Sequence, residues 1–135
     1  MKVQQPSVAA TGASCPTYII DDDTSVRVAL ERLLIAAGIR VRAFSSADAF
    51  LASGASAEGA CIILDVMMHG LSGLDLCQTL RAQKVRANFI FVTAHDTPEA
   101  RQRARDSGAI AYFRKPVDDR ALIDAIEWAR GRTGA

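Results

Sequence analysis

Residues 19–24 read IIDDDT, so two isoleucines lead directly into three aspartates. The stretch TYII at 17–20 is short, apolar and rich in β-forming residues, which predicts a buried strand that ends where the acids begin. Neighbouring like charges repel, and their crowding lowers stability unless something compensates for it. The stretch therefore indicates a strand whose carboxyl end gathers negative charge for a chemical reason.

Beyond this stretch, strand-like and helix-like segments alternate along the chain. Apolar or alternating runs predict further strands at 39–44, 60–65, 88–93 and 109–113. Amphipathic segments predict helices at 25–38, 45–53, 73–83, 97–108 and 118–130. This alternation predicts a single doubly wound α/β domain, in which a parallel sheet is covered by helices on both faces. The central strands are apolar throughout, as expected for burial on both sides.

The length of 135 residues suits one domain with one core. We expect a flexible N-terminal leader at 1–16, a folded domain at 17–131 and a short tail at 132–135. The leader lacks the apolar centre of a signal peptide. No apolar run approaches the roughly 20 residues that span a bilayer, so no membrane association is expected.

Charge and cysteine usage exclude several classes of protein. The net charge is +1 and lysines and arginines do not cluster, so direct binding to nucleic acid is not expected. Cys15, Cys61 and Cys77 form an odd set without a Cys-x-x-Cys pair. A disulfide framework or zinc site is therefore not indicated, and reduced thiols favour a cytoplasmic protein.

Polar residues follow the ends of four predicted strands. In a sheet of this type the functional site lies beyond the carboxyl ends of the strands. The residues at those ends are Asp21 and Asp22, Asp65, Thr93, and Lys115. A cluster of carboxylates without histidine or cysteine suits Mg²⁺, which prefers oxygen ligands.

This set of side chains indicates phosphoryl transfer through an aspartyl-phosphate. A metal keeps the acids ionised, so one of them can act as a nucleophile. A threonine hydroxyl and a lysine ammonium can then stabilise a phosphoryl group by position and charge.

Five segments in register resemble the receiver domains of bacterial two-component response regulators. They are DD at 21–22, LDVMMHGLSG at 64–73, VTA at 92–94, and the aromatic and lysine parts of YFRKP at 112–116. The resemblance covers roughly residues 17 to 130, and KPVDDRALIDAI at 115–126 is similar to FixJ-like regulators. It implies a flavodoxin-like, CheY-like (βα)5 fold with the five strands in the order 2-1-3-4-5.

The resemblance also implies roles for individual residues. Asp65 would be the phosphoacceptor. Asp22 would bind Mg²⁺ directly, Asp21 would bind it through water, and Met67 would supply a backbone carbonyl.

Two further roles concern the phosphoryl group and the switch. Thr93 and Lys115 would hold the phosphoryl group, with the Lys115–Pro116 peptide in the cis form. Tyr112 would be the aromatic residue that rotates on activation.

Partners follow from the same resemblance. A sensor histidine kinase or phosphotransfer protein would supply the phosphate. The surface formed by 97–108, 109–113 and 118–130 would change, and it could form a phosphorylation-dependent homodimer. The output would be transcription through a helix-turn-helix domain absent from this sequence, unless the chain is a single-domain regulator.

Two other functions stay open on the sequence. IIDDDT superficially resembles the Asp-x-Asp motif of haloacid-dehalogenase-type Mg-dependent phosphatases, in which Asp21 would be the nucleophile. Ser25 stands where that motif has threonine or valine, and Asp65 would have no role. A degenerate receiver that only binds a partner is the other alternative.

A few residues have structural interpretations or depart from the family. His69 stands where receivers usually have proline, which frees φ and restores an N–H donor. Thr24 or Asp23 is expected to cap the helix at 25–38. Cys61 and Trp128 are expected to pack inside, whereas Arg101, Arg103 and Arg105 form a solvated face.

Overall fold

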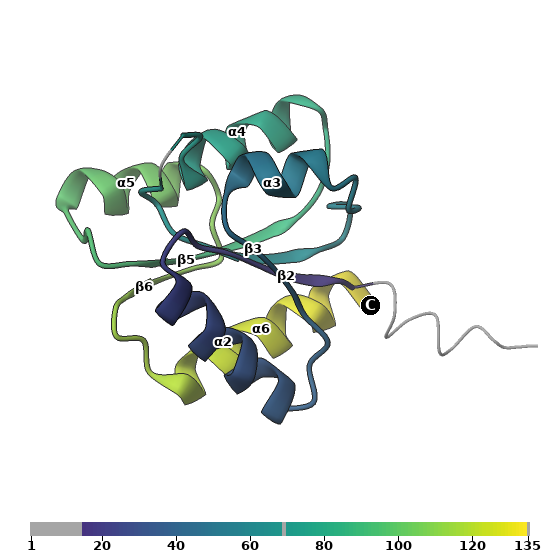
Figure 1. Cartoon of the computed structure of the whole chain (residues 1–135). Coiled ribbons are helices and arrows are strands. Elements are labelled where there is room, and N and C mark those ends of the chain that lie inside the picture. Colours follow the sequence, from purple (N-terminus) through teal and green to yellow (C-terminus); the bar gives the residue numbers. More distant parts are fainter. Residues whose placement is uncertain (1–14, 69, 135) are drawn as a thin grey trace, which may run out of the picture.

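A five-stranded parallel sheet forms the centre of the molecule. In the computed structural model, which describes residues 15–68 and 70–134, α2 and α6 cover one face of the sheet and α3, α4 and α5 cover the other (Figure 1). The strands are β2 (Thr17–Ile20), β3 (Arg42–Phe44), β4 (Cys61–Leu64), β5 (Asn88–Thr93) and β6 (Ala111–Arg114). Their order across the sheet is β3-β2-β4-β5-β6, which confirms the predicted order 2-1-3-4-5.

The helices begin where polar side chains cap them. They are α2 (Thr24–Ala36), α3 (Ala47–Ala52), α4 (Gly73–Ala82), α5 (Pro98–Asp106) and α6 (Asp119–Gly134). Of the two predicted candidates, Asp23 caps α2, because its Oδ1 accepts a hydrogen bond from the N–H of Val26 at 3.2 Å. Ser72 and Asp75 form a capping box at the start of α4. These caps fix the residues at which α2 and α4 begin.

Each strand supplies side chains to two separate cores. Ile20 of β2 and Leu64 of β4 pack beneath α3 and α4, and their neighbours Ile19 and Ile63 pack against α2 and α6. Successive side chains of a strand point to opposite faces, so a strand covered on both sides must be apolar at every position. Burial of all residues of β2, β4 and β5 follows directly from this arrangement.

Some predicted boundaries move. The strand predicted at 39–44 is confined to Arg42–Phe44, because the N–H of Ile39 is still bound to the end of α2: it donates to the carbonyl of Leu34 at 2.9 Å. Gly38 lies between them with φ of +82°, a left-handed conformation that suits glycine after a helix. At the other end of the domain, α6 continues to Gly134.

The expectation for Trp128 is wrong. Its side chain lies on α6 but is 57% exposed. The residues of α6 that face the sheet are Leu122, Ile126 and Ala129, which recur at helical spacing. Trp128 is two residues after Ile126, which corresponds to about half a helical turn, so its side chain points away from the face that packs on the sheet. Cys61 is fully buried in β4, as predicted.

The predicted leader lies largely outside the described residues. Cys15 and Pro16, its last two residues, contact the domain: Cys15 is buried, and the carbonyl of Pro16 accepts from the N–H of Cys61 at 2.8 Å. Across residues 15–68 and 70–134, none of the helices combines the length and apolar character that crossing a membrane requires.

Gly73 sets how closely α4 approaches Asp65. A Cβ at this position would lie 2.0 Å from the backbone oxygen of Asp65, and backbone cannot rotate away. We expect Gly73→Ala to lower the free energy of unfolding by about 1–3 kcal/mol or more, as overpacking does. Chemical denaturation measures the loss.

Gly131 provides a matched control. It lies in α6, and a Cβ there would meet nothing within 4 Å. Gly131→Ala should leave stability unchanged or raise it by about 0.5–1 kcal/mol. Equal effects of the two substitutions would contradict the close approach at Gly73.

Candidate functional site

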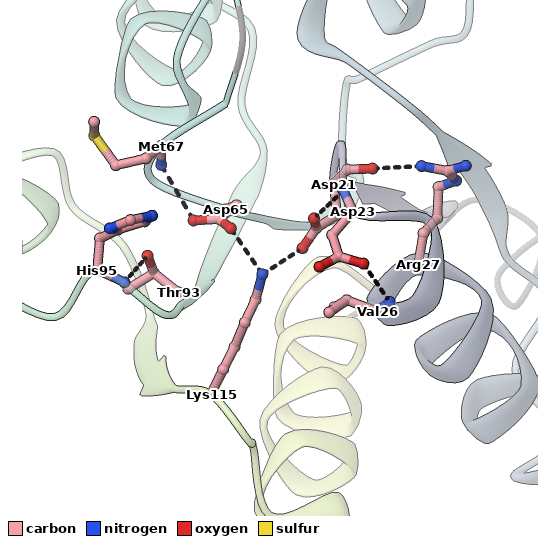
Figure 2. A network of polar contacts seen from close by, with 9 residues as sticks. All are labelled: Asp21, Asp23, Val26, Arg27, Asp65, Met67, Thr93, His95 and Lys115. Atoms are coloured by element: carbon pink, nitrogen blue, oxygen red, sulfur yellow. Dashed lines mark hydrogen bonds and ion pairs between the residues drawn. The ribbon is translucent and has the colours of Figure 1, made fainter.

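Two carboxylates and one ammonium group meet at the carboxyl edge of the sheet. Nζ of Lys115 donates to Oδ2 of Asp21 at 2.9 Å and to Oδ2 of Asp65 at 2.8 Å. The side chains of Asp21 and Asp65 are 3% and 6% exposed, and that of Lys115 is 14% exposed. Figure 2 shows the extended lysine reaching from the segment after β6 to the gap between the two acids.

Sheet register brings these three residues together. Ile20 of β2 pairs with Leu64 of β4, so the residues that follow them, Asp21 and Asp65, leave adjacent strands at the same level. The backbone N–H of Lys115 donates to the carbonyl of Thr93 at 2.9 Å, which fixes the chain after β6 to the end of β5. The Lys115–Pro116 peptide is cis, as predicted.

Each carboxylate divides its oxygens between the backbone and the lysine. Oδ1 of Asp21 accepts from the N–H of Asp23 at 2.9 Å. Oδ1 of Asp65 accepts from the N–H of Met67 at 3.1 Å. In both acids Oδ2 is the atom that contacts Lys115. Both carboxylates are therefore held in place by local backbone and share one cation.

Burial and charge act against each other here. Burial raises the pKa of Asp21, although the N–H of Asp23 and the ammonium of Lys115 lower it in part. Burial also disfavours the charged form of Lys115, but its hydrogen bonds to Asp65 and Asp21 outweigh this and raise its pKa. The ammonium group therefore stays protonated between the two acids.

Arg27 is a positioning residue that the sequence did not reveal. Its Nη1 donates to the backbone carbonyl of Asp21 at 2.7 Å, and its Nη2 donates to Oγ1 of Thr24 at 3.3 Å. A cation in the first turn of a helix opposes the helix dipole. That unfavourable placement was the available signal that Arg27 has a specific partner.

The other predicted residues lie around this centre. Thr93 ends β5 and is fully buried, and its Oγ1 accepts from the N–H of His95 at 3.0 Å. Figure 2 shows Thr93 and Met67 on one side of Asp65, and Asp21 and Asp23 on the other. The Met67 side chain is 55% exposed, and Asp22 is half-buried between Asp21 and Asp23.

Tyr112 contacts a different carboxylate. Its hydroxyl donates to Asp96 at 3.2 Å, in the loop that follows β5. The predicted departure at His69 lies outside the described residues.

The donor chemistry fits Mg²⁺, although the side chains are arranged around the lysine. Among residues 15–68 and 70–134, no group of three or more His, Cys, Asp or Glu side chains is close enough to hold a metal ion. The acids at the edge, Asp21, Asp22 and Asp65, offer only oxygen donors, and the Lys115 ammonium already lies where positive charge is favoured. Mg²⁺ keeps several waters and is usually bound through one or two carboxylates, so two of these acids are sufficient to hold it.

Comparison with known proteins places the chain in one family. The family model described as the response regulator receiver domain matches residues 17–127. The transcriptional regulatory protein FixJ of Azorhizobium caulinodans is 38% identical over 120 residues, which cover 89% of this chain and 57% of that protein. The response regulator protein TmoT of Ectopseudomonas mendocina is 39% identical over 112 residues, covering 83% and 51%. The chain thus spans about half the length of the curated relatives it matches.

The fold also matches a solved structure from this family. The crystal structure of FixJ-N superposes with a TM-score of 0.79 at 31% sequence identity, and the match covers 87% of this chain and 94% of that one.

Lys115→Met tests the shared cation. The change leaves Asp21 and Asp65 facing each other without the ammonium. Removing one partner of a buried pair costs about 3–5 kcal/mol, and we expect the lower end because Lys115 is 14% exposed. Without Lys115, the pKa of Asp21 rises further.

The pH dependence of this loss has a definite sign. A carboxyl with a raised pKa holds a proton in the folded chain that the unfolded chain has released. Its contribution to stability is full below the ordinary pKa and is lost as the pH rises through the raised value. Denaturation of Lys115→Met should therefore show the smallest deficit in acid, and Asp21→Asn added to it should recover part of the loss at neutral pH. A deficit independent of pH, and unrelieved by Asp21→Asn, would contradict the shared cation.

Proposed function

The chain belongs to the receiver-domain family of two-component response regulators, and from that premise we propose that it accepts a phosphoryl group on Asp65. The donor would be a sensor histidine kinase or a phosphotransfer protein. The observation that carries the proposal is the contact of Asp65 with both Lys115 and the N–H of Met67, which holds a buried carboxylate beside a cation and in a fixed orientation.

The transfer step follows from these contacts. One oxygen of Asp65 attacks the phosphorus of the donor's phosphohistidine; the P–N bond breaks, the P–O bond forms, and the imidazole leaves and is protonated. Lys115 then pairs with a phosphoryl oxygen, since its ammonium already lies 2.8 Å from Asp65. The Thr93 hydroxyl accepts from His95 and keeps its own proton free to donate to another phosphoryl oxygen.

Mg²⁺ is the proposed cofactor. When bound by Asp22, Asp65 and the Met67 carbonyl, and by Asp21 through water, it would neutralise the negative charge of the phosphoryl group. The chain's own contribution is to orient Asp21. Arg27 holds its backbone carbonyl, and the backbone N–H of Asp23 holds its carboxylate.

The phosphate would act on the α5–β6–α6 face, the surface formed by those three elements. Phosphate on Asp65 adds about −1.5 to −2 charge, by analogy with other phosphoresidues. Thr93 moves toward the phosphoryl group and Tyr112 turns inward, which shifts the population between two states. Two copies of the chain could then pair through this face, and sedimentation with and without beryllofluoride measures such pairing.

The output and compartment are also proposals. Curated relatives are named transcriptional regulatory proteins and response regulators, so we propose control of transcription through a helix-turn-helix domain outside this sequence. Cys61 and Cys77 are free thiols, which fits a reducing cytoplasm.

The phosphatase alternative has no support. The matched family model describes a receiver, and Asp21, the nucleophile in that alternative, contacts Lys115 and the backbone N–H of Asp23. Receivers are signalling domains, and the chemistry proposed for this chain is its own phosphorylation and dephosphorylation.

Asp65→Asn tests the phosphoacceptor. With acetyl phosphate and Mg²⁺, the wild-type chain should gain one phosphoryl group by intact mass, and Asp65→Asn should gain none. Asp23→Asn is the matched control, because its side chain caps α2 and asparagine caps equally well. Equal labelling of wild type and Asp65→Asn would refute the assignment, and label on Asp21 would favour the phosphatase.

Mg²⁺ should stabilise the folded chain without phosphate. A ligand that binds only the folded state at about 100 times its Kd adds about 2.7 kcal/mol, so thermal melting should move upward with Mg²⁺. Asp22→Asn should lose this response and Asp23→Asn should keep it. If the melting temperature of Asp22→Asn rises with Mg²⁺ as much as that of wild type, Asp22 is not a ligand.

A further inference from the structure

A second polar cluster lies outside the acidic site, where the loop after β5 meets α5 and β6. Asp96 of this loop accepts two hydrogen bonds from Arg101 of α5, from Nε to Oδ1 at 3.2 Å and from Nη2 to Oδ2 at 2.6 Å. Its Oδ1 also accepts from the Tyr112 hydroxyl of β6 at 3.2 Å. One carboxylate thus joins the loop after β5 to α5 and β6.

Arg101 also covers the aromatic ring. Its guanidinium carbon lies 6.0 Å from the centroid of the Tyr112 ring, a distance at which a cation is attracted to the ring face. The Asp96 side chain is only 10% exposed, although that of Arg101 is 55% exposed. A two-point contact to a largely covered carboxylate is geometrically specific, unlike an isolated surface ion pair.

The protonation states suit these contacts. The hydrogen bonds from Arg101 hold the pKa of Asp96 below its usual range, against a smaller opposing effect of burial, and the charges of Arg101 and Arg114 lower it further. Burial, and then Asp96, raise the pKa of Tyr112. At neutral pH the carboxylate therefore accepts and the phenol donates.

A short loop links this cluster to the phosphorylation site. Thr93 and Asp96 are three residues apart, and the loop is anchored at both ends. At one end the Thr93 hydroxyl accepts from His95 at 3.0 Å. At the other, Thr97 caps α5 by accepting from the N–H of Ala100 at 3.0 Å. A displacement of Thr93 must therefore be taken up within a few residues that include Asp96.

We propose that Asp96 and Arg101 are positioning residues for Tyr112, which they hold in the orientation of the unphosphorylated chain. The proposal deepens the function proposed above and rests on it. When Thr93 moves toward a phosphoryl group on Asp65, the loop withdraws Asp96 from the Tyr112 hydroxyl and the ring turns. Contacts made in only one of two states favour that state, so removing them raises the population of the other before any phosphate arrives.

The pair between Asp96 and Arg101 also affects the α5–β6–α6 face, through which a second copy of the chain would bind. Arg101 lies on the α5–β6–α6 face, yet its guanidinium is bound to Asp96 of its own chain. It becomes available to a second copy only after this pair separates. The cluster thereby couples the orientation of Tyr112 to the exposed charge of the face.

Fluorine NMR of the whole chain, labelled with 3-fluorotyrosine, tests the proposal. The chain has two tyrosines, and Tyr18 serves as an internal reference because it is buried and its hydroxyl donates to the carbonyl of Ser56 at 2.7 Å. Wild type with beryllofluoride and Mg²⁺ gives the Tyr112 signal of the activated form. Without beryllofluoride, Asp96→Ala and Arg101→Ala should move this signal toward the activated position, by about a fivefold or greater rise in that population.

Two further variants separate positioning from a general loss of charge. Arg101→Lys keeps the charge without the two-point contact and should restore the wild-type signal only in part. Arg103→Ala removes an exposed arginine of the same helix that has no ion pair to a described carboxylate, and its Tyr112 signal should stay at the wild-type position. An unchanged Tyr18 signal shows that each variant is folded.

The outcomes distinguish this inference from the function on which it rests. If Asp96→Ala and Arg101→Ala leave Tyr112 at the wild-type position, or if Arg103→Ala moves it equally, the positioning role is overturned. Failure of the phosphoacceptor assignment appears separately, as labelling that persists in Asp65→Asn. The comparison of unphosphorylated variants still decides the positioning role in that case.

Discussion

Two buried carboxylates and a single ammonium group hold the carboxyl edge of this sheet together. Asp21 and Asp65 follow adjacent parallel strands, so the fold itself forces their negative charges to the same place. At an effective dielectric of about 20, two unit charges about 4 Å apart interact with about 4 kcal/mol. A domain has a total stability of about 5–15 kcal/mol, so two facing carboxylates need a cation between them. Lys115 supplies it from the end of β6, at 2.9 and 2.8 Å from the two acids.

Under the proposed function, sharing of that cation would let the site work as a switch. A phosphoryl group on Asp65 would draw Lys115 toward its own oxygens, which would change the charge that Asp21 experiences. The backbone of Lys115 is hydrogen-bonded to Thr93, and Thr93 opens the loop that carries Asp96. Asp96 in turn holds Tyr112 through its hydroxyl. Phosphorylation at one carboxylate would therefore reach the α5–β6–α6 face through contacts that are each local.

The sequence was sufficient for features that depend on periodicity and on strand ends. Apolar strands buried on both faces, and acids placed just beyond them, led to the parallel sheet and to the meeting of Asp21, Asp65 and Lys115. It was insufficient where a side chain acts across elements. Arg27 contacts a backbone carbonyl, and its place in the first turn of α2 signals a partner without identifying it. Arg101 looked like part of a solvated face, because nothing in the sequence pairs it with Asp96 and Tyr112. Trp128 looked apolar enough to pack, but its position on the helix placed it outside the core.

Carbon NMR of the aspartate carboxyl groups tests the shared cation most directly. Signals of Asp21 and Asp65 would be compared between wild type and Lys115→Met, without Mg²⁺ and across a range of pH, after assignment with Asp21→Asn and Asp65→Asn. If one ammonium serves both acids, its loss moves both signals from their wild-type positions, and each signal also moves when the other carboxyl group is removed. If Lys115→Met moves the signal of one acid and leaves that of the other at its wild-type position, the two carboxylates do not share the lysine, and the coupling between them is refuted.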